Sequence, residues 1–174
     1  MIDGAYLAEC FRQEHPEDFD VFTRVRVTFG LQADGLNENF FENRRHFYNF
    51  QSPHIVLGFD NEIVRLAWSP ANELALNIPS EMVEPYYRAR YKFLRLLENF
   101  HLKHTLLLHS GDMLLFNNRR MFHSRRKIKL NGGERVIEGV CCSNEELKSE
   151  ALSLAQKLNK RGPNIRLFNG NYVQ

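Results

Sequence analysis

The chain is poor in several residue types, and each shortage excludes a class of protein. Its three cysteines are too few for the disulfide framework of a small secreted domain, and two of them, Cys141 and Cys142, are adjacent. We therefore expect a reducing compartment. The N-terminus has no basic flank followed by an apolar run, so no secretory signal is predicted. No apolar run is long enough to span a bilayer.

The chain also has little excess of one charge sign over the other. The chain has 23 lysines and arginines against 21 acidic residues, a formal net charge of +2 that does not indicate a nucleic-acid or membrane partner. One basic cluster exists, made of Arg119, Arg120, Arg125, Arg126, Lys127 and Lys129. Because no aromatic residues interleave with these cations in the way that a stacking platform for bases needs, we interpret the cluster as a solvated strand face.

The hydrophobic pattern predicts an α+β chain that is mainly β with helices. At 174 residues and 43% hydrophobic content the chain can bury a core, most simply as one domain. Strands are predicted at residues 25–29, 46–50, 54–59, 63–68, 104–109, 113–116 and 134–142, and in the basic run after His123. Helices are predicted at residues 4–13, 17–22, 80–100 and about 143–158, with a long loop at 30–45 and a loosely held tail at 159–174.

Two of these helices have a predicted buried side. In residues 80–100 the side chains that share one face are Val83, Tyr87, Tyr91, Leu94 and Leu97, with Arg88, Lys92 and Arg95 opposite. The last helix opens on a capping box that begins at Ser143 and ends at Glu146. Its predicted buried residues are Leu147, Ala151, Leu154, Ala155 and Leu158.

Residues 111–142 carry the most specific chemistry. A turn at residues 109–112 leads into an apolar strand, a polar turn and then His123. After a second turn that contains Gly132, Arg135 lies on the next predicted strand. An imidazole can coordinate Fe(II), and a guanidinium can form a bidentate ion pair with a carboxylate. This combination suits a metal site beside an anionic cosubstrate.

At this point the sequence resembles a known family. The matching motifs are Gly111-Asp112, Asn118-x-Arg120-x-x-His123, Arg135 with Gly139, Ile2-Asp3-Gly4, Ile63-Val64-Arg65-Leu66, and Ile78-Pro79-x-x-x-Val83-x-Pro85-Tyr86-Tyr87. They resemble the C-terminal part of the taurine dioxygenase (TauD/TfdA) superfamily of 2-oxoglutarate/Fe(II) oxygenases. More narrowly, they resemble the gamma-butyrobetaine and trimethyllysine dioxygenases of carnitine biosynthesis. The resemblance runs from about residue 2 to 158, which we take as the C-terminal portion of a TauD-like domain.

The resemblance implies a fold and a cofactor set. It implies an incomplete double-stranded β-helix, or jelly roll, with an inserted helix and a C-terminal helix. In the intact family enzyme, Fe(II) is held by two histidines and one carboxylate, and 2-oxoglutarate by an arginine. The matching positions here are His123 for the metal and Arg135 for 2-oxoglutarate. The remaining two ligands come as a His-x-Asp/Glu pair upstream of the Asp-Gly segment, which lies at Met1 here, so we expect this chain alone to be inactive.

The pocket positions depart from the family pattern. Ser69-Pro70 stands where the family has an Asn-Asn that contacts the substrate carboxylate, and Cys141 stands where it has a tyrosine of the trimethylammonium cage. The resemblance implies a small-molecule substrate, a quaternary ammonium carboxylate, without membrane or nucleic-acid partners. It also implies a cytoplasmic location, or a mitochondrial one if a targeting segment precedes this sequence. A homodimer is left open.

Other interpretations stay open for the same residues. His15 and Glu17 have the letters of a ligand pair, but Pro16 favours the first turn of a helix, where acidic residues suit the helix dipole. His123 could be a half-buried structural histidine, and Arg135 could pair with Glu134 or Glu138 across a sheet. Two functions therefore remain: part of a 2-oxoglutarate-dependent hydroxylase, or a pseudoenzyme and interaction module that keeps the scaffold.

Overall fold

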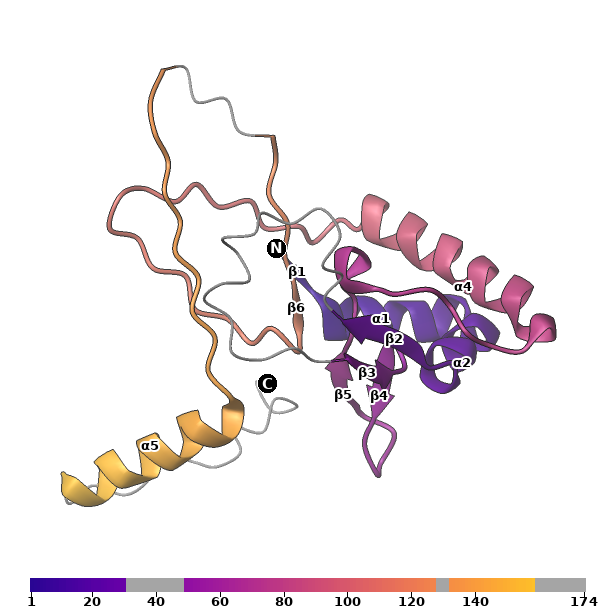
Figure 1. Cartoon of the computed structure of the whole chain (residues 1–174), viewed down its shortest axis with the longest axis horizontal. Coiled ribbons are helices and arrows are strands. Elements are labelled where there is room, and N and C mark those ends of the chain that lie inside the picture. Colours follow the sequence, from indigo (N-terminus) through magenta and orange to yellow (C-terminus); the bar gives the residue numbers. More distant parts are fainter. Residues whose placement is uncertain (31–48, 128–131, 159–174) are drawn as a thin grey trace. The chain divides into compact units, whose positions relative to one another are not determined.

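A computed structural model describes residues 1–30, 49–127 and 132–158, and the chain divides into two units, residues 1–122 and 123–174. The elements of the first unit are β1 (Ile2–Asp3), α1 (Gly4–Glu14), α2 (Pro16–Arg24), β2 (Val27–Gly30), β3 (Asn49–Ser52), β4 (Ile55–Leu57), β5 (Ile63–Leu66), the 3-10 helix η1 (Pro70–Asn72), α4 (Ser80–Asn99) and β6 (Met121–Phe122) (Figure 1). The second unit contains α5 (Asn144–Lys157).

The helices begin where the sequence predicts them. Asp3 caps α1 by accepting hydrogen bonds from the backbone N–H groups of Ala5 and Tyr6. Pro16 lies in the first turn of α2, followed by acidic residues that suit the positive end of the helix dipole. The capping box of α5 is present, with Ser143 and Glu146 each accepting from the other's backbone N–H. All four predicted helices are confirmed.

The described strands form three two-stranded antiparallel sheets. β1 pairs with β6, β2 with β3, and β4 with β5. The β4–β5 hairpin was predicted, and its turn places Asn61 at a positive φ of 62°. The α+β class is confirmed, although the described residues contain more helix than strand, so "mainly β" is wrong for this part of the chain.

The core of the first unit is aromatic. Phe11, Phe22 and Phe93 are buried where α1 and α2 pack against α4, and the Phe11 and Phe93 rings meet edge to face at 5.2 Å. The buried side of α4 differs from the predicted one. Its buried residues are Tyr86, Ala89 and Phe93, whereas Tyr87 and Tyr91 are more than half exposed. Tyrosine hydroxyls are satisfied by water, so an amphipathic count that treats tyrosine as apolar selects the wrong face.

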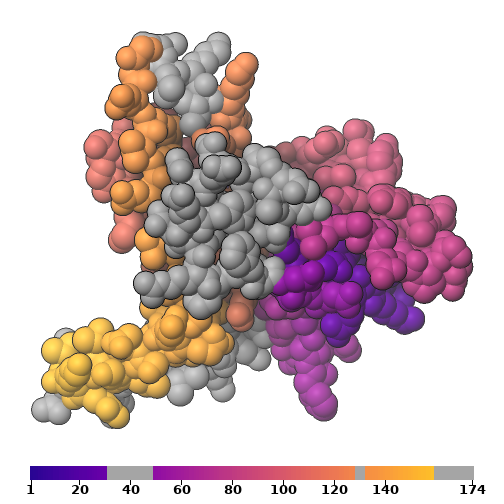
Figure 2. All heavy atoms as spheres, viewed as in Figure 1, coloured from indigo at the N-terminus to yellow at the C-terminus, as the bar shows by residue number. Residues whose placement is uncertain are grey.

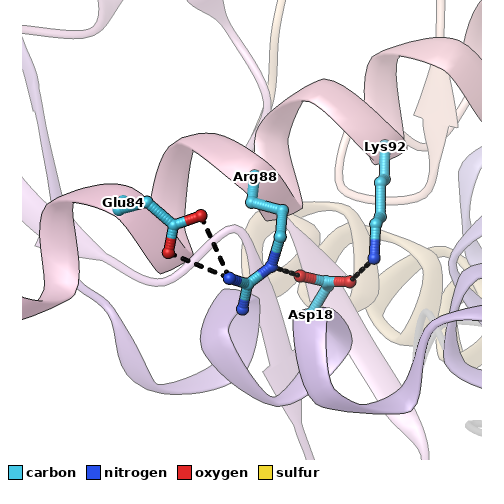
Figure 3. Close-up of polar contacts among 4 residues, drawn as sticks. All are labelled: Asp18, Glu84, Arg88 and Lys92. Carbon is cyan, nitrogen blue, oxygen red and sulfur yellow. Dashed lines mark hydrogen bonds and ion pairs between the residues drawn. The ribbon is translucent and has the colours of Figure 1, made fainter.

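A buried carboxylate joins α2 to α4 (Figure 3). The Asp18 side chain is 4% exposed, and its two oxygens accept from Arg88 Nε at 3.2 Å and Lys92 Nζ at 2.6 Å. Arg88 also pairs with Glu84 one turn earlier, at 2.9 Å. Burial opposes ionisation of Asp18, but the bonds from Lys92 and Arg88 outweigh it and lower the pKa of this carboxyl. The cations of α4 therefore hold α2 in place and do not only face solvent.

Several predicted strands are absent from the described structure. Residues 104–109, 113–116, 123–127 and 134–142 are irregular, and Leu107, Met113 and Val140 are exposed by 73%, 90% and 94%. Figures 1 and 2 draw residues 132–142, in orange, as an extended strip that leads into α5. A strand exists only through a ladder of hydrogen bonds to a neighbour. His104 exchanges two backbone hydrogen bonds with Met1, but no described segment forms such a ladder with these residues. Their strand predictions are wrong for the chain as described.

The second unit buries little. Of the predicted buried residues of α5, only Ala155 is buried, whereas Leu147, Leu154 and Leu158 are 42%, 52% and 62% exposed. Gly30, the first residue of the predicted loop at 30–45, is the last residue of β2. The rest of that loop, the first residues of the predicted strand at 46–50, and the predicted tail at 159–174 lie outside the described residues. No helix among the described residues is long and apolar enough to cross a membrane.

Candidate functional site

The turn that precedes His123 is built by side-chain hydrogen bonds. Asn117 Oδ1 accepts from the backbone N–H of Arg119 at 2.9 Å, and Asn117 O accepts from that of Arg120 at 3.0 Å. The earlier turn at residues 109–112 is also confirmed, with Gly111 at φ 90° and Asp112 accepting from the backbone of His109. Strand β6 follows the second turn directly and ends one residue before His123.

Arg120 forms a bidentate ion pair with Asp3. Its Nε and Nη2 atoms donate to both carboxylate oxygens of Asp3, with Nη2 to Oδ2 at 2.6 Å. Burial opposes ionisation of Asp3, but Arg120 and the backbone donors of the helix cap lower the pKa of its carboxyl. One carboxylate thus caps α1 and anchors the arginine of the Asn-x-Arg-x-x-His motif.

Gly4 allows the two segments to approach. Its N–H donates to Arg120 O at 2.9 Å, and a Cβ at this position would lie 2.6 Å from that oxygen and 2.5 Å from Leu66 Cδ1. The Asp-Gly pair of the sequence motif therefore has a physical reason. Asp3 binds the arginine, and the absence of a side chain at the next residue lets the backbones meet.

The two predicted site residues are both exposed and both lie in irregular segments of the second unit, His123 just after β6 and Arg135 three residues after Gly132. No ion pair joins Arg135 to Glu134 or Glu138 in the described ranges. Within residues 1–30, 49–127 and 132–158, no group of three His, Cys, Asp or Glu side chains could hold a metal ion. His15 lies edge-on to the Phe11 ring at 5.6 Å, and Glu17 is exposed in the first turn of α2.

A buried polar network in the first unit was not predicted. His54 is 2% exposed, and its Nδ1 lies 2.7 Å from Ala67 O, a pure acceptor, so Nδ1 carries the proton. Its Nε2 therefore accepts from the Tyr86 hydroxyl at 2.9 Å. Burial, together with the nearby Arg90 charge, lowers the pKa of His54 to about 4 against the bond to Ala67 O. The imidazole is neutral at pH 7.

The network continues to an ion pair. Arg90 Nη1 donates to the Tyr86 hydroxyl at 3.2 Å and to Glu73 Oε2 at 2.6 Å. The Arg90 guanidinium also lies 4.9 Å over the Trp68 ring. The sequence does contain one sign of this network. Arg90 is a cation one turn after Tyr86 and three residues before Phe93, on the buried side of α4.

Comparison with known proteins identifies the family. The model of the taurine catabolism dioxygenase TauD, TfdA family matches residues 1–141. The chain belongs to the TauD/TfdA family. It is 24% identical over 164 residues to gamma-butyrobetaine dioxygenase of Homo sapiens, covering 91% of this chain and 40% of that protein. The corresponding Pseudomonas sp. (strain AK-1) protein is 24% identical over 154 residues, 88% of this chain and 38% of the relative.

A trimethyllysine dioxygenase of Meyerozyma guilliermondii is 26% identical over 152 residues, 86% of this chain and 35% of the relative. The chain thus spans about two fifths of the length of the relatives it matches. These comparisons confirm the resemblance inferred from the Asp3-Gly4 and Asn118-x-Arg120-x-x-His123 motifs.

Proposed function

We propose that this chain is the C-terminal portion of a 2-oxoglutarate- and Fe(II)-dependent hydroxylase related to gamma-butyrobetaine dioxygenase. His123 supplies one metal ligand and Arg135 binds a carboxylate of 2-oxoglutarate. The family match over residues 1–141, which includes both positions, carries the proposal. The substrate is a small molecule, and the domain is a jelly roll completed by strands outside these 174 residues. A homodimer and a cytoplasmic location belong to the same proposal.

The described residues do not fit Fe(II) by themselves. One exposed imidazole binds iron far more weakly than a facial triad of two histidines and one carboxylate. The described residues contain no group of three His, Cys, Asp or Glu side chains that could hold a metal ion. Iron and 2-oxoglutarate supply the oxidising chemistry in the family. This chain contributes one nitrogen ligand and one guanidinium, and the other two ligands must come from elsewhere.

A second candidate is a pseudoenzyme or interaction module that retains the scaffold. The observation that favours it is the exposure of apolar residues in the irregular segments, with Leu107 at 73% and Val136 at 82%. Such segments suit pairing with another polypeptide.

One assay and one sequencing experiment test the proposal. The purified 174-residue chain, given Fe(II), 2-oxoglutarate and O2, is expected to release no succinate above a His123→Ala control. Consumption of 2-oxoglutarate with stoichiometric iron would refute the claim that this chain supplies only part of the iron site. The transcript upstream of Met1 then separates the two candidates. An in-frame His-x-Asp segment supports the hydroxylase, and a stop codon supports the pseudoenzyme.

A further inference from the structure

A cavity of about 390 Å³ lies within the first unit, and none of its lining residues belongs to the segment that carries His123. Its walls come from β2, from the segment that begins at η1 and from α4. The apolar part of the wall is formed by Val27, Leu74 and Leu76, and the polar part by Glu73, Tyr86 and Arg90. The segment after η1 is fixed to β2, because Glu73 bridges Phe29 and the Leu74 N–H donates to Thr28 O at 2.9 Å.

Arg90, which lines this cavity, has an unused guanidinium edge. Only its Nη1 atom is engaged, by Glu73 and the Tyr86 hydroxyl. Its Nε and Nη2 groups donate to no atom of the described residues. Neither atom is buried, so both remain accessible. A guanidinium carries five N–H donors, and its Nε–Nη2 edge matches the two oxygens of a carboxylate.

The guanidinium is held rigidly. Arg90 Cζ lies 4.9 Å from the centre of the Trp68 ring, and the Arg90 side chain is 19% exposed. The Tyr86 hydroxyl that accepts from Arg90 is itself oriented by donation to His54 Nε2. The backbone carbonyl of Ala67 fixes the tautomer of His54. In each hydrogen bond of this network only one partner can be the donor, so the free edge of Arg90 is preorganised.

We propose that this cavity binds a small monocarboxylate, whose oxygens accept from the Nε–Nη2 edge of Arg90 and whose short apolar tail contacts Val27, Leu74 and Leu76. Glu73 is the opposing element. It orients Arg90 but places a negative charge beside the bound anion. Removing its charge while keeping an acceptor should therefore strengthen binding, whereas removing the guanidinium should weaken it.

The site is tested on the ¹⁵N-labelled 174-residue chain by titration with sodium butyrate, followed through backbone amide shifts. We expect shifts concentrated at Leu74, Leu76 and Tyr87. Arg90→Gln should weaken the apparent affinity about tenfold or more, and Glu73→Gln should tighten it by a few-fold, about what a charge-assisted bond and one neighbouring charge are worth. The matched controls Arg95→Gln and Glu81→Gln change the same charges at exposed positions of α4 and should leave the affinity unchanged.

Three further arms make the result decisive. Butyramide, which has the same tail without the charge, should shift the same amides less than a tenth as strongly, and an equal response would overturn the proposal. Inorganic phosphate separates carboxylate recognition from general anion binding, and an equal affinity for phosphate would overturn the carboxylate assignment. If Arg90→Gln does not fold, Arg90→Lys keeps the charge and loses the planar edge. Unchanged affinity in a folded Arg90→Lys variant, or weaker binding by Glu73→Gln, would contradict the site.

Discussion

The two units of the chain differ in how their apolar residues are used. In residues 1–122 the amphipathic helices α1, α2 and α4 bury Phe11, Phe22 and Phe93 against one another. In residues 123–174 the described part buries Ala155, while Val136 and Val140 are 82% and 94% exposed. A helix satisfies its own backbone and needs only a packing partner. A strand needs hydrogen bonds from a neighbour as well.

The difference agrees with the length comparison. The chain spans about two fifths of the length of its relatives, and several of its predicted strands remain irregular. The helical part of the first unit is held by contacts made within these 174 residues. The comparison therefore predicts that substitutions in the two units have very different effects on stability.

The largest expected effect is the loss of a core ring. Phe22→Ala removes a fully buried side chain that packs against Phe93 at 5.4 Å, and should lower the free energy of unfolding by about 3–5 kcal/mol. Leu154→Ala in α5, at a position 52% exposed, should change it by no more than about 0.5 kcal/mol. Urea unfolding gives the two free-energy changes. It is followed by circular dichroism for both variants and also by Trp68 fluorescence for Phe22→Ala. Equal losses would break the comparison.

The next largest effect concerns the Asp18 cluster of Figure 3. Asp18→Asn leaves Arg88 and Lys92 without their buried anion, and should cost about 2–3 kcal/mol, less than a fully buried pair because both cations can turn to solvent. The matched control is Asp20→Asn, which breaks an exposed pair with Arg24 and should cost about 0.5 kcal/mol or less. Similar thermal shifts for the two variants would mean that the cluster does not hold α2 to α4.

A pH dependence follows from His54. The unfolded imidazole takes up a proton below about pH 6.5, but the folded one does so only near pH 4, so protons favour the unfolded chain in this window. Lowering the pH from 7 to 5 should therefore reduce stability by about 2 kcal/mol through this residue. A His54→Gln variant, less stable at pH 7, should lose most of that slope. A slope that survives the substitution would assign the pH dependence to other groups.

A smaller effect is expected at the first residues of the chain. Asp3→Asn removes the bidentate pair with Arg120 but keeps a weaker helix cap, and should cost about 1–2 kcal/mol. Hydrogen exchange at the β1–β6 amides should accelerate by a corresponding factor. Glu9→Gln, which breaks the partly exposed pair with Arg12 within α1, is the control and should leave that exchange unchanged. Unaltered β1–β6 exchange in Asp3→Asn would show that the ion pair does not anchor the segment before His123.

Local signals predicted the helices well and the buried details poorly. Asp3, Pro16 and Ser143 mark helix starts through short-range bonds that any sequence reading can see. The buried face of α4 was predicted wrongly because Tyr87 and Tyr91 count as apolar, while the partly buried Arg90 counts as polar. Arg90 is bound there by Glu73, 17 residues earlier, a contact that no periodicity reveals.

The candidate site shows the same division. The motif Asn118-x-Arg120-x-x-His123 predicted the family, and the structure supplies a reason for its arginine through Asp3. The roles of His123 and Arg135 stay predictions, because a metal site requires ligands brought together in space. The described residues contain no such group. The fold of residues 134–142 could not follow from local sequence either, since a strand is a property of a pair.

The most direct measurement is succinate release by a polypeptide that extends this sequence upstream through an in-frame His-x-Asp segment. With Fe(II), 2-oxoglutarate and a gamma-butyrobetaine-like substrate, we expect turnover that His123→Ala abolishes and Arg135→Gln reduces by at least about tenfold. His109→Ala, a change at another exposed histidine, should leave it unchanged. Full activity in the His123→Ala variant would contradict the account.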